Sequence, residues 1–171
     1  QLAKLKGATV FTTVGSRDKA EIAKSCGADH VILYREMSFR DEVRRLTNGR
    51  GVDIVYDSVG KDTFVDSLHC LRVRGTCVLV GNSSGLVRDF DPMELAEAGS
   101  VFLTRPHMQH YVKTPEEYAW RANDVFRWIQ EGILKVKIGH KFSLEKAVEA
   151  HLLLAGRQTS GKLLLAIDEH L

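Results

Sequence analysis

The chain has 171 residues, of which 44% are hydrophobic and 27% are charged, and its formal net charge is +2. This length suffices for one buried core, and the small net charge argues against a nucleic acid or a membrane surface as partner. No apolar run approaches the roughly 20 residues of a membrane span, and the three cysteines form no disulfide framework, so we expect a cytoplasmic protein with buried, inert thiols.

The beginning of the chain, residues 1–8, has the pattern of the last turns of a helix. Gly7 is suited to end that helix, because glycine tolerates the left-handed backbone found at helix ends. A chain that starts inside a helix leads us to expect a fragment of a larger protein.

Short apolar strands and helices then alternate up to residue 85. The predicted strands cover residues 9–14, 30–34, 53–57 and 76–80. The predicted helices between them cover residues 16–25, 38–47 and 62–71. This alternation is typical of a parallel sheet with helices on both faces. We therefore predict an α/β fold, in which ligands bind beyond the carboxyl ends of the strands.

The later part of the chain is less regular. The predicted elements are a short helix over 92–97, a strand over 101–103, extended pieces over 134–138 and 140–142, a helix over 143–155 and a strand over 162–167. The longest helix starts at Thr114, with Pro115 and Glu117 in its first turn, and runs to about residue 130. Its aromatic residues occupy both faces, which predicts core packing for some and a subunit contact for the rest. We find no linker and no repeat, and we predict one domain over residues 1–171.

The turn after the first strand carries more positive charge than a helix start usually does. Gly15 permits a tight turn, and Ser16 is suited to cap the helix that follows. Arg17 and Lys19 lie in its first turn, where the helix dipole favours acidic side chains and only Asp18 is acidic. Two cations beside unpaired backbone N–H groups predict an anion site, most naturally for a phosphate. The alternative, that both cations are solvated surface charges, stays open at this point.

Four of the predicted strands end in small, flexible or polar residues. These ends are residues 15–16, 58–60, 81–85 and 104–105. In a parallel sheet they lie along one edge, where glycines let a ligand approach the backbone. Each segment alone is explained as an ordinary turn. All four at one edge, beside a phosphate-type site, predict a nucleotide cleft.

Three of these segments resemble a known family in their residues, order and spacing. They are Tyr56-Asp57-Ser58-Val59-Gly60, Gly81-Asn82-Ser83-Ser84-Gly85 and Thr104-Arg105-Pro106. Together with Val14-Gly15-Ser16 and the ending from residue 157 to 165, they resemble the quinone oxidoreductases related to zeta-crystallin. These form a zinc-independent branch of the medium-chain dehydrogenase/reductases. The resemblance implies a Rossmann-type, doubly wound parallel sheet, here truncated at the N-terminus, with the first strand, the glycine-rich loop and the preceding catalytic domain missing.

NADPH is the cofactor that this resemblance implies. The predicted cofactor-binding residues are Gly15, Ser16, Arg17, Lys19, Tyr34, Val59, Gly81, Asn82, Ser83 and Arg157. By the resemblance, Ser16 and Lys19 would contact the 2′-phosphate, with Tyr34 beside the adenosine end. Residues 81–83 would lie along the nicotinamide half, with Val59 lining the groove and Arg157 reaching the cofactor from the C-terminal loop. Arg17 is added on its charge alone.

The residues themselves support NADP over NAD. NAD-specific relatives place a carboxylate at the end of the strand that precedes this turn, where it binds the ribose 2′-hydroxyl. Val14 and Gly15 occupy that place here. A missing carboxylate and two nearby cations favour a cofactor with a 2′-phosphate.

The predicted reaction is hydride transfer from NADPH to a quinone or an activated alkene such as an enone. We predict no catalytic acid or base and no metal site in this chain, since His107 and His110 lack a third ligand and Asp57 is interpreted as structural. We expect the fragment alone to be inactive. The resemblance also implies a homodimer formed near residues 101–103. Two alternatives stay open: an enoyl-reductase segment of a polyketide or fatty acid synthase, and a non-enzymatic NADPH-binding module.

Overall fold

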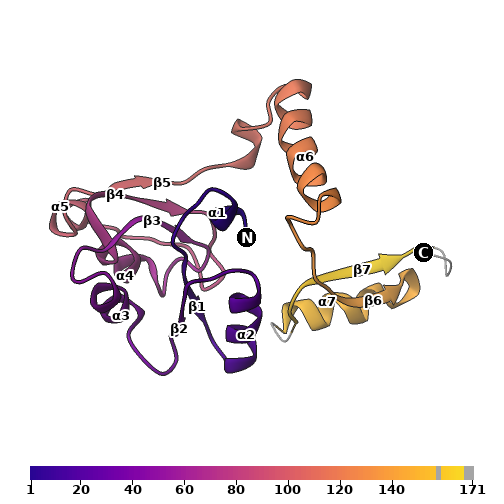
Figure 1. Ribbon diagram of the computed structural model, residues 1–171, viewed down its shortest axis with the longest axis horizontal. Coiled ribbons are helices and arrows are strands. Elements are labelled where there is room, and N and C mark those ends of the chain that lie inside the picture. The colour runs from indigo at the N-terminus through magenta and orange to yellow at the C-terminus, as the bar shows by residue number, and fades with distance from the viewer. Residues whose placement is uncertain (157–158, 168–171) are drawn as a thin grey trace.

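Strands and helices alternate from Phe11 to Thr104 in the computed structural model, which describes residues 1–156 and 159–167 (Figure 1). A short helix α1 (Leu2–Leu5) comes first. The alternating elements are β1 (Phe11–Val14), α2 (Arg17–Ser25), β2 (His30–Leu33), α3 (Phe39–Leu46), β3 (Val52–Asp57), α4 (Phe64–His69), β4 (Leu71–Leu79), α5 (Met93–Glu97) and β5 (Phe102–Thr104). The predicted α/β pattern is confirmed.

These strands form two parallel sheets. β1 pairs with β2, with Val14 opposite Leu33, and β3, β4 and β5 pair in that order. Within the described residues, no strand pairing joins the first sheet to the second. All of the pairs are parallel, so the carboxyl ends of neighbouring strands meet at the same edge. Of the four strand ends predicted to share one edge, those after β3, β4 and β5 do so, whereas the end of β1 belongs to the other sheet.

Helix α3 joins the two sheets in place of a strand pairing. Val43 of α3 is buried against Ile32 of β2 and against Cys70, which follows α4. A second cluster lies around Phe64 and Leu68 of α4 and contains residues of β4. The core is thus continuous from β2 through α3 to α4. Burying these side chains supplies most of the stabilisation of the α/β part of the chain.

The segment from 62 to 80 departs from the sequence prediction. Helix α4 ends at His69, and β4 begins at Leu71, five residues before the predicted strand. Leu71 is fully buried and pairs with Val52, after which the register shifts so that Ile54 lies opposite Thr76. An apolar residue in a helical pattern is here the start of a strand, because tertiary pairing overrides the local period.

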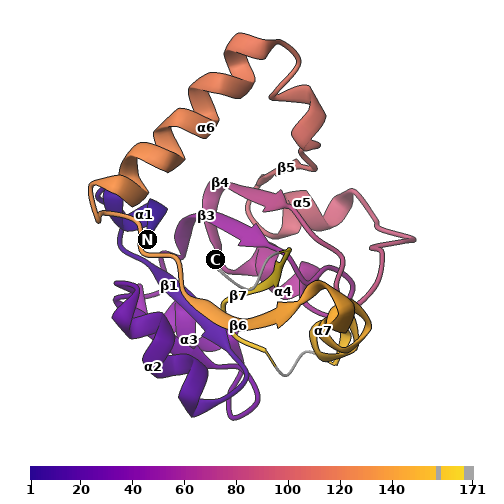
Figure 2. The same cartoon turned by 90° about the vertical axis from the view of Figure 1, so that its right-hand side faces the viewer.

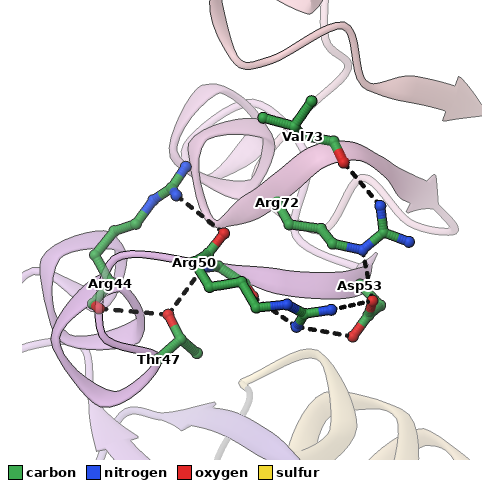
Figure 3. A network of polar contacts seen from close by, with 7 residues as sticks. Arg44, Thr47, Arg50, Asp53, Arg72 and Val73 are labelled. Carbon is green, nitrogen blue, oxygen red and sulfur yellow. Dashed lines mark hydrogen bonds and ion pairs between the residues drawn. The ribbon is translucent and has the colours of Figure 1, made fainter.

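A network of arginines and one aspartate holds the amino ends of β3 and β4 (Figure 3). The guanidinium of Arg44 donates to the carbonyls of His69 (2.8 Å) and Leu71 (3.0 Å), which fastens α3 to the junction of α4 and β4. Asp53 of β3 accepts from Arg50 at 2.7 Å and from Arg72 at 2.6 Å. This edge is opposite the predicted ligand edge, so the network is structural.

Asp53 should make stability depend on pH below about pH 4. Hydrogen bonds from Arg50, and then from Arg72, lower its pKa from 3.8 to about 2. A lowered pKa means that the carboxylate stabilises the folded state fully above pH 3.8 and loses this effect as pH falls towards 2. Because the Asp53 side chain is 56% exposed, screening limits its effect to about 1 kcal/mol.

We expect Asp53→Asn to lower the free energy of unfolding by that amount at pH 7 and by almost nothing near pH 2. Urea unfolding across this pH range measures the difference from the wild type, which cancels the effect of other carboxylates. Asp62→Asn is the matched control, since Asp62 is exposed and its side chain has no partner in the described part of the chain. A pH-independent loss in Asp53→Asn would contradict the prediction.

The rest of the chain stands apart from the α/β body formed by β1 to β5 and their helices (Figure 1), and α6 projects from it in both views (Figures 1 and 2). It comprises a 3-10 turn (Met108–His110), α6 (Pro115–Gln130), β6 (Ile138–Ser143), a 3-10 turn (Leu144–Lys146), α7 (Ala147–Ala155) and β7 (Lys162–Ala166). β6 and β7 form a separate parallel pair. The predicted cap of α6 is confirmed, because the hydroxyl of Thr114 accepts from the N–H of Glu117 at 3.2 Å.

Helix α6 has no buried residue, so core packing is the wrong explanation for its aromatic side chains. Tyr118, Trp120 and Phe126 are each more than 60% exposed. Contact with the body is made near the end of the helix, where the ammonium of Lys6 lies 5.7 Å from the ring centre of Trp128. The predicted subunit contact stays a prediction.

Two of the three thiols are buried, as predicted. Burial raises the pKa of Cys70 to about 12 and that of Cys77 to about 11, so both are protonated and inert near neutral pH. Cys26 is only partly buried, which corrects the prediction for that residue.

No helix in residues 1–156 and 159–167 combines the length and the apolar character that crossing a membrane requires.

Candidate nucleotide-binding site

The carboxyl ends of β1 and β2 bring Gly15 and Tyr34 together. The backbone N–H of Tyr34 donates to the carbonyl of Val14 at 3.2 Å, which continues the pairing of the two strands into the turns that follow. A Cβ atom placed on Gly15 would lie 2.8 Å from the hydroxyl oxygen of Tyr34. Any larger residue at position 15 would therefore displace the tyrosine side chain from this corner.

Helix α2 begins at the same corner, and Ser16 caps it as predicted. The Ser16 hydroxyl accepts from the backbone N–H of Lys19 at 3.4 Å. Lys19 points into solvent from the first turn, and its ammonium has no ion-pair or hydrogen-bond partner within the described ranges. The guanidinium of Arg17 lies 3.6 Å from the carboxylate of Glu36 and its side chain is 84% exposed. The two predicted cations thus differ, because only Arg17 has an acidic neighbour.

A second group of predicted residues lies at the ends of β3 and β4. The carbonyl of Val59 accepts from both the N–H (2.9 Å) and the hydroxyl (2.8 Å) of Ser84. A Cβ on Gly81 would lie 2.2 Å from the carbonyl oxygen of Ser58, so only glycine lets the two loops approach this closely. Gly60 and Gly85 form a further parallel bridge between these loops. Asn82 and Ser83 lie exposed on the outside of this pair of loops.

Asp57 fixes the loop after β3 in this second group through hydrogen bonds, and its predicted structural role is confirmed. The carboxylate is 4% exposed and accepts from the backbone N–H groups of Val59 (2.8 Å) and Gly60 (3.0 Å). It also accepts from the hydroxyls of Thr63 (2.8 Å) and Ser67 (2.9 Å). All of its acceptor capacity is directed into the protein, so Asp57 fixes the loop that carries Val59.

Arg35 was not predicted from the sequence, although its side chain reaches the first group. The Nε atom of Arg35 lies 3.4 Å from the position that a Cβ on Gly15 would take. The available signal was its position directly after Tyr34, at the end of the second strand. Arg157 lies outside the described residues. Each of the two groups is thus held together by contacts of its own, between the turns after β1 and β2 in the first and between the loops after β3 and β4 in the second.

The first group has the chemistry that a phosphate requires. Unpaired N–H groups at the start of α2, the ammonium of Lys19 and the guanidinium of Arg35 are all donors, and Gly15 leaves space that a Cβ would fill. Val14 and Gly15 offer no carboxylate at the end of β1 to repel an anion. These residues therefore fit a nucleotide that carries a phosphate at this corner.

Two other features lie away from both groups. A cavity of about 240 Å³ is lined by Lys61 of the loop before α4, by residues of α4 and α5 such as Phe64, and by the segment before α5, which contains Phe90. None of the predicted cofactor residues lines it. His107 and His110 lie with ring centres 5.6 Å apart. Across the described ranges, no three His, Cys, Asp or Glu side chains gather where they could hold a metal ion.

Fold, strand-end loops and sequence together place the chain in a family. The sequence model of the zinc-binding dehydrogenase family matches residues 1–121, and the chain belongs to this family. Within it, the chain corresponds to the C-terminal portion of the quinone oxidoreductases, as the resemblance predicted.

Two relatives and one solved structure illustrate this similarity. The chain is 41% identical over 163 residues to a 2-haloacrylate reductase of Burkholderia (93% of this chain, 48% of the relative) and 42% identical over 167 residues to quinone oxidoreductase 1 of Escherichia coli (96% and 51%). The structure of the Escherichia coli quinone oxidoreductase complexed with NADPH superposes with a TM-score of 0.91 at 40% identity, over 96% of this chain and 52% of that chain. The chain thus spans about half the length of the relatives that it matches.

Proposed function

We propose that the chain is the NADPH-binding portion of a reductase that transfers a hydride to a quinone or an activated alkene. The observation that carries the proposal is the corner at Gly15, where Ser16, Lys19 and the start of α2 offer donors and where Val14 and Gly15 place no carboxylate at the end of β1. A 2′-phosphate satisfies such donors, whereas the bare 2′-hydroxyl of NADH does not. That a quinone oxidoreductase related to this chain was solved with NADPH supports the choice of cofactor.

We further propose that the two sheets of the body are halves of one Rossmann sheet. The strand order of such a sheet is 3-2-1-4-5-6. β2 and β1 correspond to strands 3 and 2, and β3, β4 and β5 to strands 4, 5 and 6. One more strand is then needed between β1 and β3. A central parallel strand is normally covered on both faces, whereas Ile54 (51%) and Tyr56 (71%) of β3 are exposed, which supports further elements beside β3 in the complete sheet.

This arrangement assigns roles to both groups of loop residues. Gly15, Ser16, Lys19 and Tyr34 bind the adenosine end, and Val59, Gly81, Asn82 and Ser83 line the nicotinamide half. In a completed sheet both groups lie at the carboxyl edge, on either side of the added strand, where dinucleotides bind. Arg157 stays a proposed contact from the C-terminal loop. We also propose a homodimer formed at β5, whose Phe102 is 63% exposed on an edge strand.

The acceptor is proposed as an electron-poor, conjugated small molecule. The names of the relatives point to quinones and to a haloacrylate, and both are systems that a hydride can reduce. When bound, the cofactor supplies the hydride, and the side chains of this chain bind and orient it. No acid or base of this chain is assigned to the reaction.

A binding titration with NADPH and NADH tests the proposed cofactor. We expect NADPH to bind about tenfold more tightly or better, because a charge-assisted contact to a phosphate contributes about 1.5–3 kcal/mol. Lys19→Ala should remove most of this preference and leave NADH binding unchanged. Lys24→Ala is the matched control, since Lys24 lies in the same helix and pairs with Glu21 at 2.9 Å. Equal affinity of the wild type for both nucleotides would contradict a 2′-phosphate site.

A further inference from the structure

Three cations lie around the turn at Gly15, and the structure distinguishes them. Arg17 and Lys19 come from the first turn of α2, and Arg35 comes from the turn after β2. The guanidinium of Arg17 lies 3.6 Å from the carboxylate of Glu36, which neutralises part of its charge. Lys19 and Arg35 have no hydrogen-bond or ion-pair partner in the residues that the structure describes. Two charges therefore stay available for a ligand.

The position of Arg35 is set by the backbone of its turn. The N–H of Tyr34 donates to Val14 at 3.2 Å, and the N–H groups of Glu36 and Met37 donate to Leu33 at 2.9 and 3.2 Å. These bonds place Arg35 at the tip of a tight turn whose base is paired with β1. Its side chain lies back over Gly15, with Nε 3.4 Å from the site of an added Cβ. The guanidinium thus lies over the turn that leads into α2.

We propose that Arg35, and not Arg17, is the second cation that binds the 2′-phosphate of NADPH together with Lys19. This inference rests on the proposed function and names one of the residues that determine cofactor specificity. A guanidinium presents two parallel N–H donors and suits bidentate contact with a phosphate, while an ammonium acts as a point charge. Lys19 lies in the first turn of α2, which follows Gly15, and Arg35 reaches Gly15 from the turn after β2, so we place one phosphate at this corner, within reach of both cations.

The acidic groups nearby do not occupy Arg35. Glu36 is directed to Arg17, and Glu21 is paired with Lys24 at 2.9 Å. Asp18 lies in the first turn of α2 and has no ion-pair partner within the described ranges. It therefore reduces the positive potential at the corner without forming a contact with Arg35.

Isothermal titration calorimetry with two nucleotides measures the contribution of the 2′-phosphate to the binding affinity separately from that of the rest of the cofactor. Adenosine 2′,5′-bisphosphate carries the phosphate, and adenosine 5′-monophosphate lacks it. We expect Arg35→Gln to weaken binding of the bisphosphate about tenfold and to leave the monophosphate unchanged. Arg35→Lys should lose part of the affinity, because the charge remains but the bidentate geometry is lost.

Two further arginine variants give the comparison. Arg17→Gln should change the affinity for the bisphosphate by less than about threefold, because its partner Glu36 already offsets the charge. Arg88→Gln, an exposed arginine in the segment before α5, should change neither affinity and controls for the loss of one positive charge. Thermal unfolding of every variant checks that the fold is intact.

The outcomes separate the inference from the proposed function. A preference of the wild type for the bisphosphate that survives Arg35→Gln overturns the role of Arg35 and leaves the proposed cofactor in place. A loss in Arg17→Gln as large as that in Arg35→Gln also overturns the inference. A wild type that does not prefer the bisphosphate overturns both proposals.

Discussion

Asp57→Ala is expected to lower the free energy of unfolding by about 3–5 kcal/mol. The buried carboxylate accepts hydrogen bonds from two backbone N–H groups and two hydroxyls, at 2.8–3.0 Å. Alanine leaves the part-buried N–H of Val59 and the buried N–H of Gly60 without an acceptor, and a buried group of this kind costs about 1–3 kcal/mol. Urea unfolding at pH 7, monitored by circular dichroism, measures the difference.

Asp57→Asn separates the hydrogen bonds from the charge. The asparagine oxygen can accept from Val59 and Gly60, and its amide can donate to the hydroxyls of Thr63 and Ser67, which turn to accept. We expect Asn to cost less than half as much as Ala. Asp62→Ala controls for the loss of a carboxylate on the same loop, because Asp62 is exposed, and it should stay within about 0.5 kcal/mol of the wild type. Equal losses in Asp57→Ala and Asp62→Ala would contradict the role given to Asp57.

This network connects stability with the proposed site. Asp57 fixes the N–H groups of the loop that carries Val59, and the carbonyl of Val59 in turn holds Ser84 in the next loop. A nucleotide that binds beyond these strand ends meets a surface fixed before it arrives, which reduces the ordering cost of binding. Asp57 therefore acts on the proposed cofactor site as a positioning residue, without contact to the ligand.

Local signals account for the features that the sequence predicted correctly. Ser16 and Thr114 each cap a helix through a side-chain oxygen, as their positions before an amphipathic segment indicate. Such caps depend on residues three positions apart and need no tertiary information. The strand ends were also predictable, because glycine and serine clusters follow apolar runs.

The features that were missed depend on contacts between distant segments. Leu71 begins a strand because it pairs with Val52, and no local period reports that pairing. Arg35 reaches Gly15 only because β1 and β2 are neighbours, and the same pairing brings Glu36 to Arg17. The sequence identified a cationic corner and assigned one of its charges to Arg17, whereas the tertiary structure gives that arginine an acidic neighbour.

Gly81→Ala is expected to destabilise the chain by about 3 kcal/mol, near the upper end of the usual cost of overpacking. Gly81 has no positive φ, so the backbone conformation suits alanine, but the new Cβ would lie 2.2 Å from the carbonyl oxygen of Ser58. That oxygen belongs to a loop held by Asp57 and Ser84 and does not yield easily. Gly49→Ala is the matched control, with φ +80° and no atom within 4 Å of its Cβ, and backbone strain there should cost about 1 kcal/mol.

The same variant decides why position 81 is a glycine. Sequence reasoning explains it by the close approach of a cofactor, and the structure gives a second reason, the contact between two loops of the protein itself. If only the cofactor required it, Gly81→Ala would unfold at the same urea concentration as the wild type when no nucleotide is present and would lose affinity for NADPH. We expect the opposite order, a large loss of stability without nucleotide, because the backbone of Ser58 already fills the space that a side chain at position 81 would need.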